Sequence, residues 1–214
     1  MCGGMARALF ITFEGGEGAG KSTQVGRLAE RLANTGREVV ATREPGGSAG
    51  AEKIRELLVT GDTDRWSPVT ETLLMYAARR DHIERVIKPA LERGAVVICD
   101  RFLDSTRAYQ GAGGGASAGL IEALERCTLD GAWPDLTLMF DLSVVTGLAR
   151  AAGRAGSEAR FESKSRQFHE RLRAGFLEIA RREPARCIVV DASGDPDGVA
   201  EAVWSVVKER MVGI

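Results

Sequence analysis

The topology of this 214-residue chain follows from nine residues, Gly15-Gly16-Glu17-Gly18-Ala19-Gly20-Lys21-Ser22-Thr23. An apolar run at residues 8–13 precedes them and predicts a buried strand, and apolar residues at helical spacing follow from Val25 to Ala33. A strand, a G-x-x-x-x-G-K-S loop and a helix in this order predict a phosphate-binding loop. Backbone N–H groups and the helix N-terminus would bind the anion, Lys21 would reach the outer phosphates, and the Ser22 hydroxyl would ligate Mg²⁺. The loop alone leaves open whether the protein is a kinase, an ATPase or a GTP-dependent switch.

The composition excludes several classes of protein. Hydrophobic residues make up 44% of the chain, enough for a sizeable core, and the net charge of −1 gives no overall attraction to nucleic acid or to a membrane. No apolar run approaches the length of a membrane span, and the N-terminus lacks the apolar core of a signal peptide. The cysteines show neither metal-ligand spacing nor a disulfide framework, so we expect Cys99, Cys127 and Cys187 to be buried free thiols in a reducing cytoplasm.

Helical patterns alternate with short apolar runs along the whole chain. Beyond the first strand, the runs that predict strands are residues 38–42, 95–100, 136–141 and 187–191. This alternation predicts an α/β fold, a doubly wound five-stranded parallel sheet flanked by helices. We expect a single domain over residues 1–214, with a loose tail at 1–7 and a short arginine-rich lid at 150–162. Seven basic and three acidic side chains between Arg150 and Arg173 favour a phosphate-covering lid.

Basic side chains recur where the predicted strands end. Arg43 follows the second strand, and Arg101 follows the third, whose last residue is Asp100. The carboxyl ends of parallel strands meet at one edge of a sheet, so these groups would face the glycine-rich loop. Two phosphorylated substrates that meet head-on need this much positive charge, which favours phosphoryl transfer over hydrolysis. Glu17 would be repelled by a triphosphate, and we therefore expect it to face the second substrate.

Seven stretches, in order along the first two thirds of the chain, resemble the bacterial thymidylate kinases of the nucleoside monophosphate kinase superfamily. They are Phe13–Ser22, Thr42–Gly47, Tyr76–Arg79, Val86–Leu91, Asp100–Phe102, Ser105–Gly111 and Pro134–Leu138. The phosphate loop is generic, whereas Asp-Arg-Phe with Ala-Tyr-Gln-Gly downstream is specific to that family. The resemblance implies ATP-dependent phosphorylation of dTMP to dTDP with Mg²⁺, in dTTP biosynthesis, by a homodimer.

The resemblance also implies which residues bind each nucleotide. For ATP they are Gly15, Gly16, Glu17, Gly18, Ala19, Gly20, Lys21, Ser22, Thr23 and Arg150. For dTMP they are Glu17, Arg43, Pro45, Met75, Arg79, Arg101, Ser105, Thr106, Tyr109 and Gln110. In this assignment Arg43 and Arg101 hold the dTMP phosphate, Arg79 contacts the thymine edge and Glu17 meets the sugar 3′-OH. Tyr109 packs on the sugar face, where a ribose 2′-OH would clash.

Catalysis is assigned by the same resemblance to Lys21, Arg101, Glu17 and one arginine of the lid. Arg154 is the first candidate for that arginine, with Arg150 and Arg160 behind it, and Arg150 has the alternative role of lying along the adenine. Ser22 and Asp100 would hold Mg²⁺, Asp100 partly through water.

One position departs from the family pattern. Four residues before Arg79 the family usually carries a phenylalanine that stacks on thymine, and here the residue is Met75. A thioether can pack flat against a ring, with less area than a phenyl group, and Phe102 or Tyr76 could compensate.

Other functions remain open on the residues alone. The chain could be a P-loop kinase for another monophosphate or a small metabolite, or a nucleotide-binding switch that transfers nothing. A switch would not need Arg43, Arg79 and Arg101, which disfavours that interpretation. His82 and His169 have no role in any of these hypotheses, and we expect both on helix surfaces.

Overall fold

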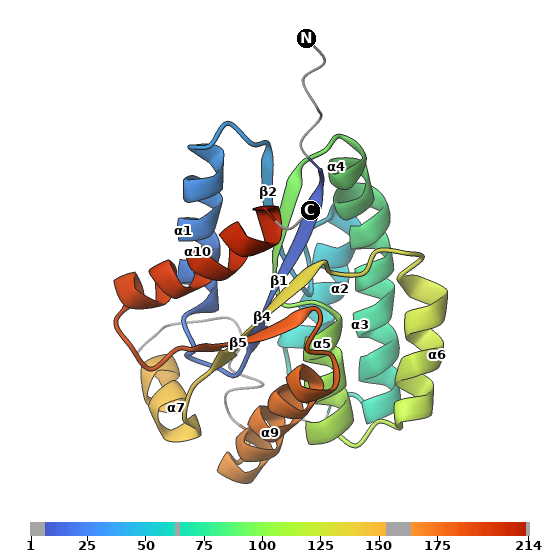
Figure 1. The fold of residues 1–214 in the computed structure, drawn as a ribbon. Helices are drawn as coiled ribbons and strands as arrows, with labels where there is room; N and C mark the ends of the chain where they lie inside the picture. The colour runs from blue at the N-terminus through green and yellow to red at the C-terminus, as the bar shows by residue number, and fades with distance from the viewer. Residues whose placement is uncertain (1–6, 63–64, 153–163, 213–214) are drawn as a thin grey trace.

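The computed structural model describes residues 7–62, 65–152 and 164–212. Its centre is a five-stranded sheet in the order β2-β3-β1-β4-β5 (Figure 1). The strands are β1 (Leu9–Gly15), β2 (Val39–Arg43), β3 (Val96–Asp100), β4 (Leu136–Asp141) and β5 (Cys187–Asp191). Every neighbouring pair is parallel, with Phe13 opposite Asp100 and Glu14 opposite Met139. The predicted α/β fold is confirmed, and all five carboxyl ends lie at one edge of the sheet.

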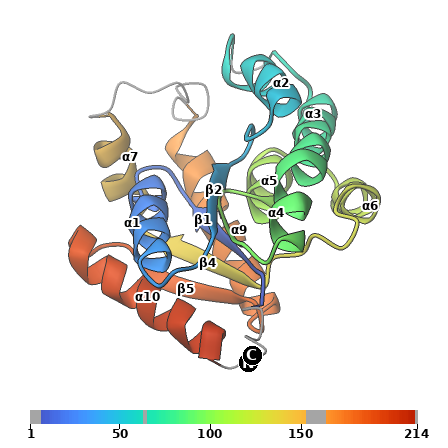
Figure 2. The same ribbon diagram turned by 90° about the horizontal axis from the view of Figure 1, so that it is seen from above.

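Helices cover both faces of this sheet (Figure 2). One face carries α1 (Lys21–Ala33) and α10 (Pro196–Val212). The other helices are α2 (Ala49–Val59), α3 (Pro68–His82), η1 (Ile83–Ile87), α4 (Lys88–Glu92), α5 (Leu103–Thr106), η2 (Arg107–Gly113), α6 (Ala118–Thr128), α7 (Val144–Ala152) and α9 (Arg166–Arg182). Of these, η1, α4 and α9 pack against the opposite face of the sheet. The elements η1 and η2 are π-helical.

The alternation of side chains along β1 explains the two layers. Leu9, Ile11 and Phe13 pack against α1 and α10, whereas Phe10 packs against η1 and α4. Successive strand side chains point to opposite faces, and a central parallel strand is apolar on both. Glu14, the residue before the last of β1, is fully buried, so its carboxyl group must find its partners inside the protein.

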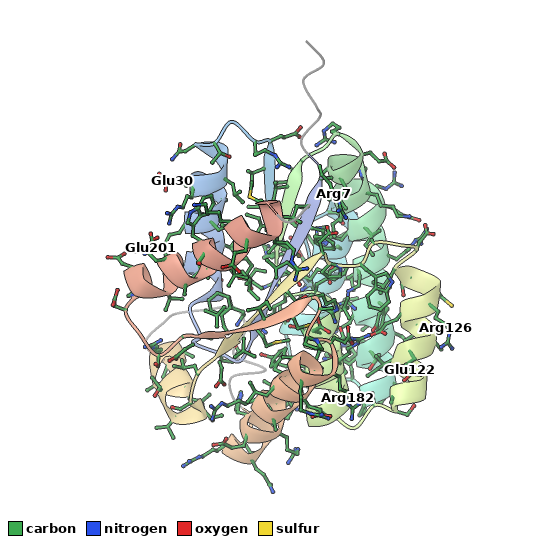
Figure 3. All side chains as sticks on the ribbon, in the orientation of Figure 1. Arg7, Glu30, Glu122, Arg126, Arg182 and Glu201 are labelled. Atoms are coloured by element: carbon green, nitrogen blue, oxygen red, sulfur yellow. The ribbon has the colours of Figure 1, made fainter. Side chains whose placement is uncertain are left out.

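Three of the helices begin directly after a capping serine. The hydroxyls of Ser48, Ser67 and Ser117 accept hydrogen bonds from the backbone N–H of the third residue of α2, α3 and α6. Charged side chains such as Glu30, Arg126 and Arg182 point outward (Figure 3). Within the part of the chain that the structure describes, no helix combines the length and hydropathy needed to cross a membrane.

Three expectations about burial are wrong. His82 and His169 are 0% and 4% exposed instead of lying on helix surfaces. His82 is retained inside because its two ring nitrogens lie 3.0 Å from Glu44 Oε1 and 2.7 Å from Thr42 Oγ1. Cys127 is exposed, because α6 buries the side that carries Ile121 instead.

Candidate active site

The glycine-rich loop joins β1 to α1 and needs its glycines for two reasons. Gly15, Gly18 and Gly20 have φ values of 137°, 69° and 84°, a region that other residues rarely adopt. A Cβ atom on Gly18 would lie 2.0 Å from the carbonyl oxygen of Gly147 in α7. The Lys21 ammonium donates to the carbonyls of Gly15 (3.0 Å) and Gly16 (2.8 Å), which fixes the curvature of the loop.

The two predicted metal ligands lie in contact beside this loop. Ser22 Oγ donates a hydrogen bond of 2.5 Å to Asp100 Oδ2, which joins the start of α1 to the end of β3. A hydroxyl and a carboxylate are the oxygen donors that Mg²⁺ prefers, usually together with substrate phosphates. The described residues contain no cluster of three His, Cys, Asp or Glu side chains that could hold a metal alone. The pair therefore fits a magnesium ion that arrives with ATP.

A cavity of about 500 Å³, the inner cavity, opens next to the loop. Its lining consists of Glu17, Glu44, Pro45, Val59, Met75, Arg79, Arg101, Phe102, Ser105, Thr106, Tyr109 and Gln110. Nine of the ten residues predicted to bind the second nucleotide are in that lining, although they come from four separate parts of the sequence.

Arg43 is the predicted residue that does not line the inner cavity. Its Nη2 donates to Glu52 Oε1 (3.0 Å) and Oε2 (3.1 Å), and its side chain is 55% exposed. It lies instead in an adjoining open hollow together with Ser22 and Asp100. Its part in phosphate binding stays a prediction.

Arg79 reaches the inner cavity from α3 and is held rigidly. Its Nε donates to Glu44 (2.8 Å), and its Nη2 donates to the Phe102 carbonyl (2.9 Å) and to Thr106 Oγ1 (3.0 Å). Its other terminal nitrogen, Nη1, is buried and has no partner among the described residues. Buried N–H groups are almost always paired, so an unpartnered one in a residue that lines the inner cavity needs an explanation.

Arg101 stands between the loop and the inner cavity in a strained conformation. Its φ of 68° lies in the left-handed region, which is sparsely populated by residues other than glycine and is found at functional sites. Its guanidinium donates to the Gly15 carbonyl (3.0 Å) and to both carboxylate oxygens of Glu17 (3.1 and 3.2 Å). Tyr109 adds a hydroxyl hydrogen bond of 2.5 Å to Glu17. Burial raises the pKa of Glu17, but Arg101, Lys21 and Tyr109 outweigh it and lower the pKa overall.

Two buried carboxylates that support the site were missed in the sequence. Glu44 accepts from Arg79 and lies 3.0 Å from His82 Nδ1. Glu14 accepts from the backbone N–H of Phe102 (2.8 Å) and from Ser105 Oγ (2.5 Å). The available signal was a carboxylate at the end of an apolar strand, since charged residues are buried only when paired.

Glu14 makes the stability of the fold depend on pH. Burial and the nearby Asp104 carboxylate raise the pKa of Glu14 from 4.5 to about 7, against smaller opposing effects of Ser105 and Arg101. Between these two values only the folded protein keeps the proton, so unfolding releases it and the free energy of unfolding falls as the pH rises. We expect the free energy of unfolding of wild type to fall by up to about 3 kcal/mol between pH 4.5 and 7, relative to that of Glu14→Gln.

Urea unfolding of both proteins at several values between pH 4.5 and 8 measures this difference. Groups common to the two proteins cancel in the comparison. Parallel stability curves across the range would show that Glu14 does not retain its proton.

The lid predicted at residues 150–162 is described only at its beginning. Arg150 in α7 donates to the carbonyls of Ala192 (3.1 Å) and Ser193 (3.3 Å), on the segment between β5 and α10. Arg154 and Arg160 lie outside the described residues. The choice among the three lid arginines therefore stays a prediction.

Comparison with known proteins agrees with this geometry. The family model described as thymidylate kinase matches residues 13–203. A thymidylate kinase of Caulobacter vibrioides is 67% identical over 207 residues, covering 97% of this chain and 99% of that protein. One of Bradyrhizobium diazoefficiens is 52% identical, covering 96% and 91% respectively. The crystal structure of thymidylate kinase from Ehrlichia chaffeensis superposes with a TM-score of 0.76 at 36% identity, covering 94% of this chain and 99% of that one. The chain therefore belongs to the thymidylate kinase family.

Proposed function

We propose that the chain transfers a phosphoryl group from ATP in the glycine-rich loop to dTMP in the inner cavity, which yields dTDP. Membership of the family gives the reaction, ATP-dependent phosphorylation of dTMP. The observation that supports this cavity as the dTMP site is Arg79, whose buried and unpartnered Nη1 belongs to a guanidinium fixed by three other hydrogen bonds. A thymine carbonyl oxygen is the kind of acceptor that such a group would select.

The contacts within the site support distinct roles along the path of the phosphoryl group. Lys21 sits at the loop and would stabilise charge on the transferring group. Arg101 would bind the dTMP phosphate, because it is the cation that reaches both the loop and the inner cavity. Tyr109 and Glu17 would contact the sugar, the carboxylate accepting from the 3′-OH. Thr106, already bonded to Arg79, would complete the contacts to the base.

We also propose that Ser22 and Asp100 hold Mg²⁺, because their side-chain oxygens are suitable ligands for this ion. When bound, the ion would neutralise charge on the ATP phosphates. The part of these two side chains is to hold oxygen ligands at the mouth of the loop, and their 2.5 Å hydrogen bond keeps the ends of two separate elements in register.

A homodimer and a cytoplasmic location also remain proposals. The end of α2 and the start of α3, which contact one another, carry exposed apolar side chains at Leu57, Val69 and Leu73. Val69 and Leu73 are one turn apart and share a face of α3, which is the pattern of a surface covered by a second copy. The buried free thiols Cys99 and Cys187 are consistent with a reducing compartment.

The reaction is tested by ADP formation in the presence of ATP and Mg²⁺. We expect turnover with dTMP, weaker turnover with dUMP, and little with CMP or AMP. Absence of dTMP-dependent turnover would refute the proposal, and a preference for another monophosphate would move the chain to a different specificity within the superfamily.

Met75 provides a test of how the base is held. Met75 and Phe102 both line the inner cavity, but the Phe102 ring lies 5.1 Å under the Arg79 guanidinium. Tyr76 is 1% exposed and donates to Glu125 instead. With both aromatic rings already engaged, we expect Met75→Phe to lower the KM for dTMP about threefold to tenfold, the contribution of one aromatic stack. Steady-state kinetics measures this, with the KM for ATP as the internal control, and an unchanged KM for dTMP would show that another residue fills the stacking position.

A further inference from the structure

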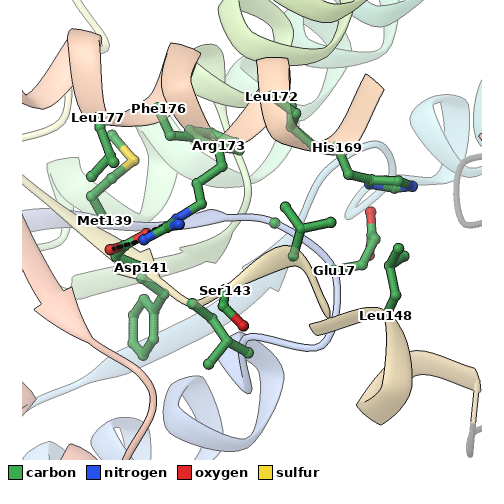
Figure 4. Close-up of a pocket in the computed structure, with 14 residues that line it drawn as sticks. Glu17, Met139, Asp141, Ser143, Leu148, His169, Leu172, Arg173, Phe176 and Leu177 are labelled. Atoms are coloured by element: carbon green, nitrogen blue, oxygen red, sulfur yellow. Dashed lines mark hydrogen bonds and ion pairs between the residues drawn. The ribbon is translucent and has the colours of Figure 1, made fainter. Parts of the chain in front are cut away.

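A second cavity, the outer cavity, lies behind Glu17 (Figure 4). It lies between the glycine-rich loop, the end of β4, α7 and α9. Its walls are mainly apolar and include Met139, Leu148, Leu172 and Phe176. Among the described lining residues, Glu17 is the one that belongs to both cavities. The Glu17 carboxylate is therefore the boundary between the nucleotide side and this side.

His169 on α9 lines the outer cavity with a ring nitrogen that is buried and unpaired among the described residues. Its side chain is 4% exposed, and its Nε2 has no hydrogen-bond partner among the described residues. Figure 4 shows the imidazole and the Glu17 carboxylate on the same side of the cavity. Buried polar side-chain atoms are normally paired, so an unpaired one beside the active site needs an explanation.

The other polar groups of the outer cavity are already engaged. Arg173 donates to both carboxylate oxygens of Asp141, at 2.6 and 2.9 Å. Ser143 Oγ lies 2.7 Å from Thr146 Oγ1. Of the charged groups that line this cavity, Glu17 is thus the acceptor to which His169 can donate a hydrogen bond.

The proposed reaction changes the surroundings of Glu17. In this structure its carboxylate is compensated by Arg101, Lys21 and Tyr109. When a dTMP phosphate binds Arg101, a dianion competes for the same guanidinium, and the buried carboxylate loses part of its compensation. A replacement donor on the far side would keep Glu17 charged and oriented.

We propose that His169 is a positioning residue whose Nε2–H donates to Glu17 when the dTMP phosphate engages Arg101, so that Glu17 stays aimed at the sugar 3′-OH. The inference rests on the proposed function and deepens it. No proton is transferred, because a neutral imidazole with its proton on Nε2 is sufficient.

The test compares His169→Leu with His169→Gln in steady-state kinetics. Leucine provides an apolar side chain at this position but no hydrogen-bond donor. In the glutamine variant, the amide nitrogen lies near the position of the imidazole Nε2. We expect His169→Leu to raise the KM for dTMP about tenfold, the effect of one hydrogen bond to a charged group. The KM for ATP should not change, and His169→Gln should restore most of the affinity for dTMP.

A substrate analogue separates positioning from packing. With 3′-deoxythymidine monophosphate, which lacks the hydroxyl that Glu17 would accept from, wild type and His169→Leu should have equal KM values. An equal loss with both substrates would overturn the proposal, and so would an unchanged KM for dTMP in His169→Leu. Glu170→Gln, at the exposed neighbouring position, is the matched control.

If His169→Leu fails to fold, His169→Asn replaces it in the comparison. The shorter asparagine amide lies near the position of Nδ1 and cannot reach as far as Nε2. Equal KM values for His169→Asn and His169→Gln would overturn the proposal. Absence of dTMP-dependent turnover in the wild-type protein would refute the proposed function itself. Wild-type turnover is therefore measured before any variant is compared.

Discussion

Lys21→Ala should lower kcat by about 10²–10³-fold, the effect of removing a preorganised positive group from a charged transition state. Lys21 is the sole basic residue between Gly15 and Thr23 and is 6% exposed, so neither a neighbour in the loop nor water can replace its ammonium. Phosphoryl transfer depends on positioning and charge stabilisation, which is why the loss should appear in kcat. Coupled measurement of ADP formation at saturating dTMP provides the value.

The same lysine also supports the loop, and the experiment must separate the two roles. Its ammonium holds the carbonyls of Gly15 and Gly16, so a loosened loop would weaken ATP binding as well as turnover. Lys21→Met keeps most of the side-chain stem and should lose turnover to a similar degree with a smaller change in thermal stability. Lys53→Ala, at an exposed position on α2, should behave as wild type. Turnover of Lys21→Ala within about tenfold of wild type would contradict the assigned role.

Some elements of the fold can be predicted from the sequence because the interactions that determine them are local. The β1 strand, the glycine-rich loop and α1 follow one another without a gap, and each has its own signature in periodicity or in residue type. The capping serines at 48, 67 and 117 mark helix starts by bonding within three residues of themselves. The π-helical elements η1 and η2 were not predicted, because one extra residue in a turn leaves the local apolar spacing almost unchanged.

Buried polar side chains were the part of the site that sequence reasoning could not place. Glu14 takes its partner Ser105 from 91 positions away, and His82 pairs with Glu44 across 38 positions. No local pattern reveals such pairs, and without them a histidine on a helix is more naturally placed outside. Arg43 shows the converse limit: the end of β2 is where it was expected, but its guanidinium turns to Glu52, which is nearby in both sequence and space.

Arg101→Ala should reduce kcat/KM for dTMP by about 10³-fold, because two effects coincide at one side chain. The substitution removes the cation that would bind the dTMP phosphate, and it also leaves Glu17 buried without its main partner. Removing one member of a buried ion pair typically costs about 3–5 kcal/mol of folding free energy, so the variant should also be less stable than wild type. A matched surface variant, Arg182→Ala, removes an arginine whose side chain is 71% exposed and should leave kinetics unchanged.

The double variant Arg101→Ala with Glu17→Gln distinguishes these two effects. If the unpaired Glu17 carboxylate destabilises the single variant, neutralising it should recover most of the thermal stability, since an amide tolerates the same burial far better than a charge. Activity should not recover, because the phosphate still lacks its guanidinium and the 3′-OH has lost a charged acceptor. Recovery of kcat/KM together with stability would mean that Arg101 serves mainly to neutralise Glu17. In that case the phosphate contact would pass to Arg43, which would have to leave Glu52 to reach the inner cavity.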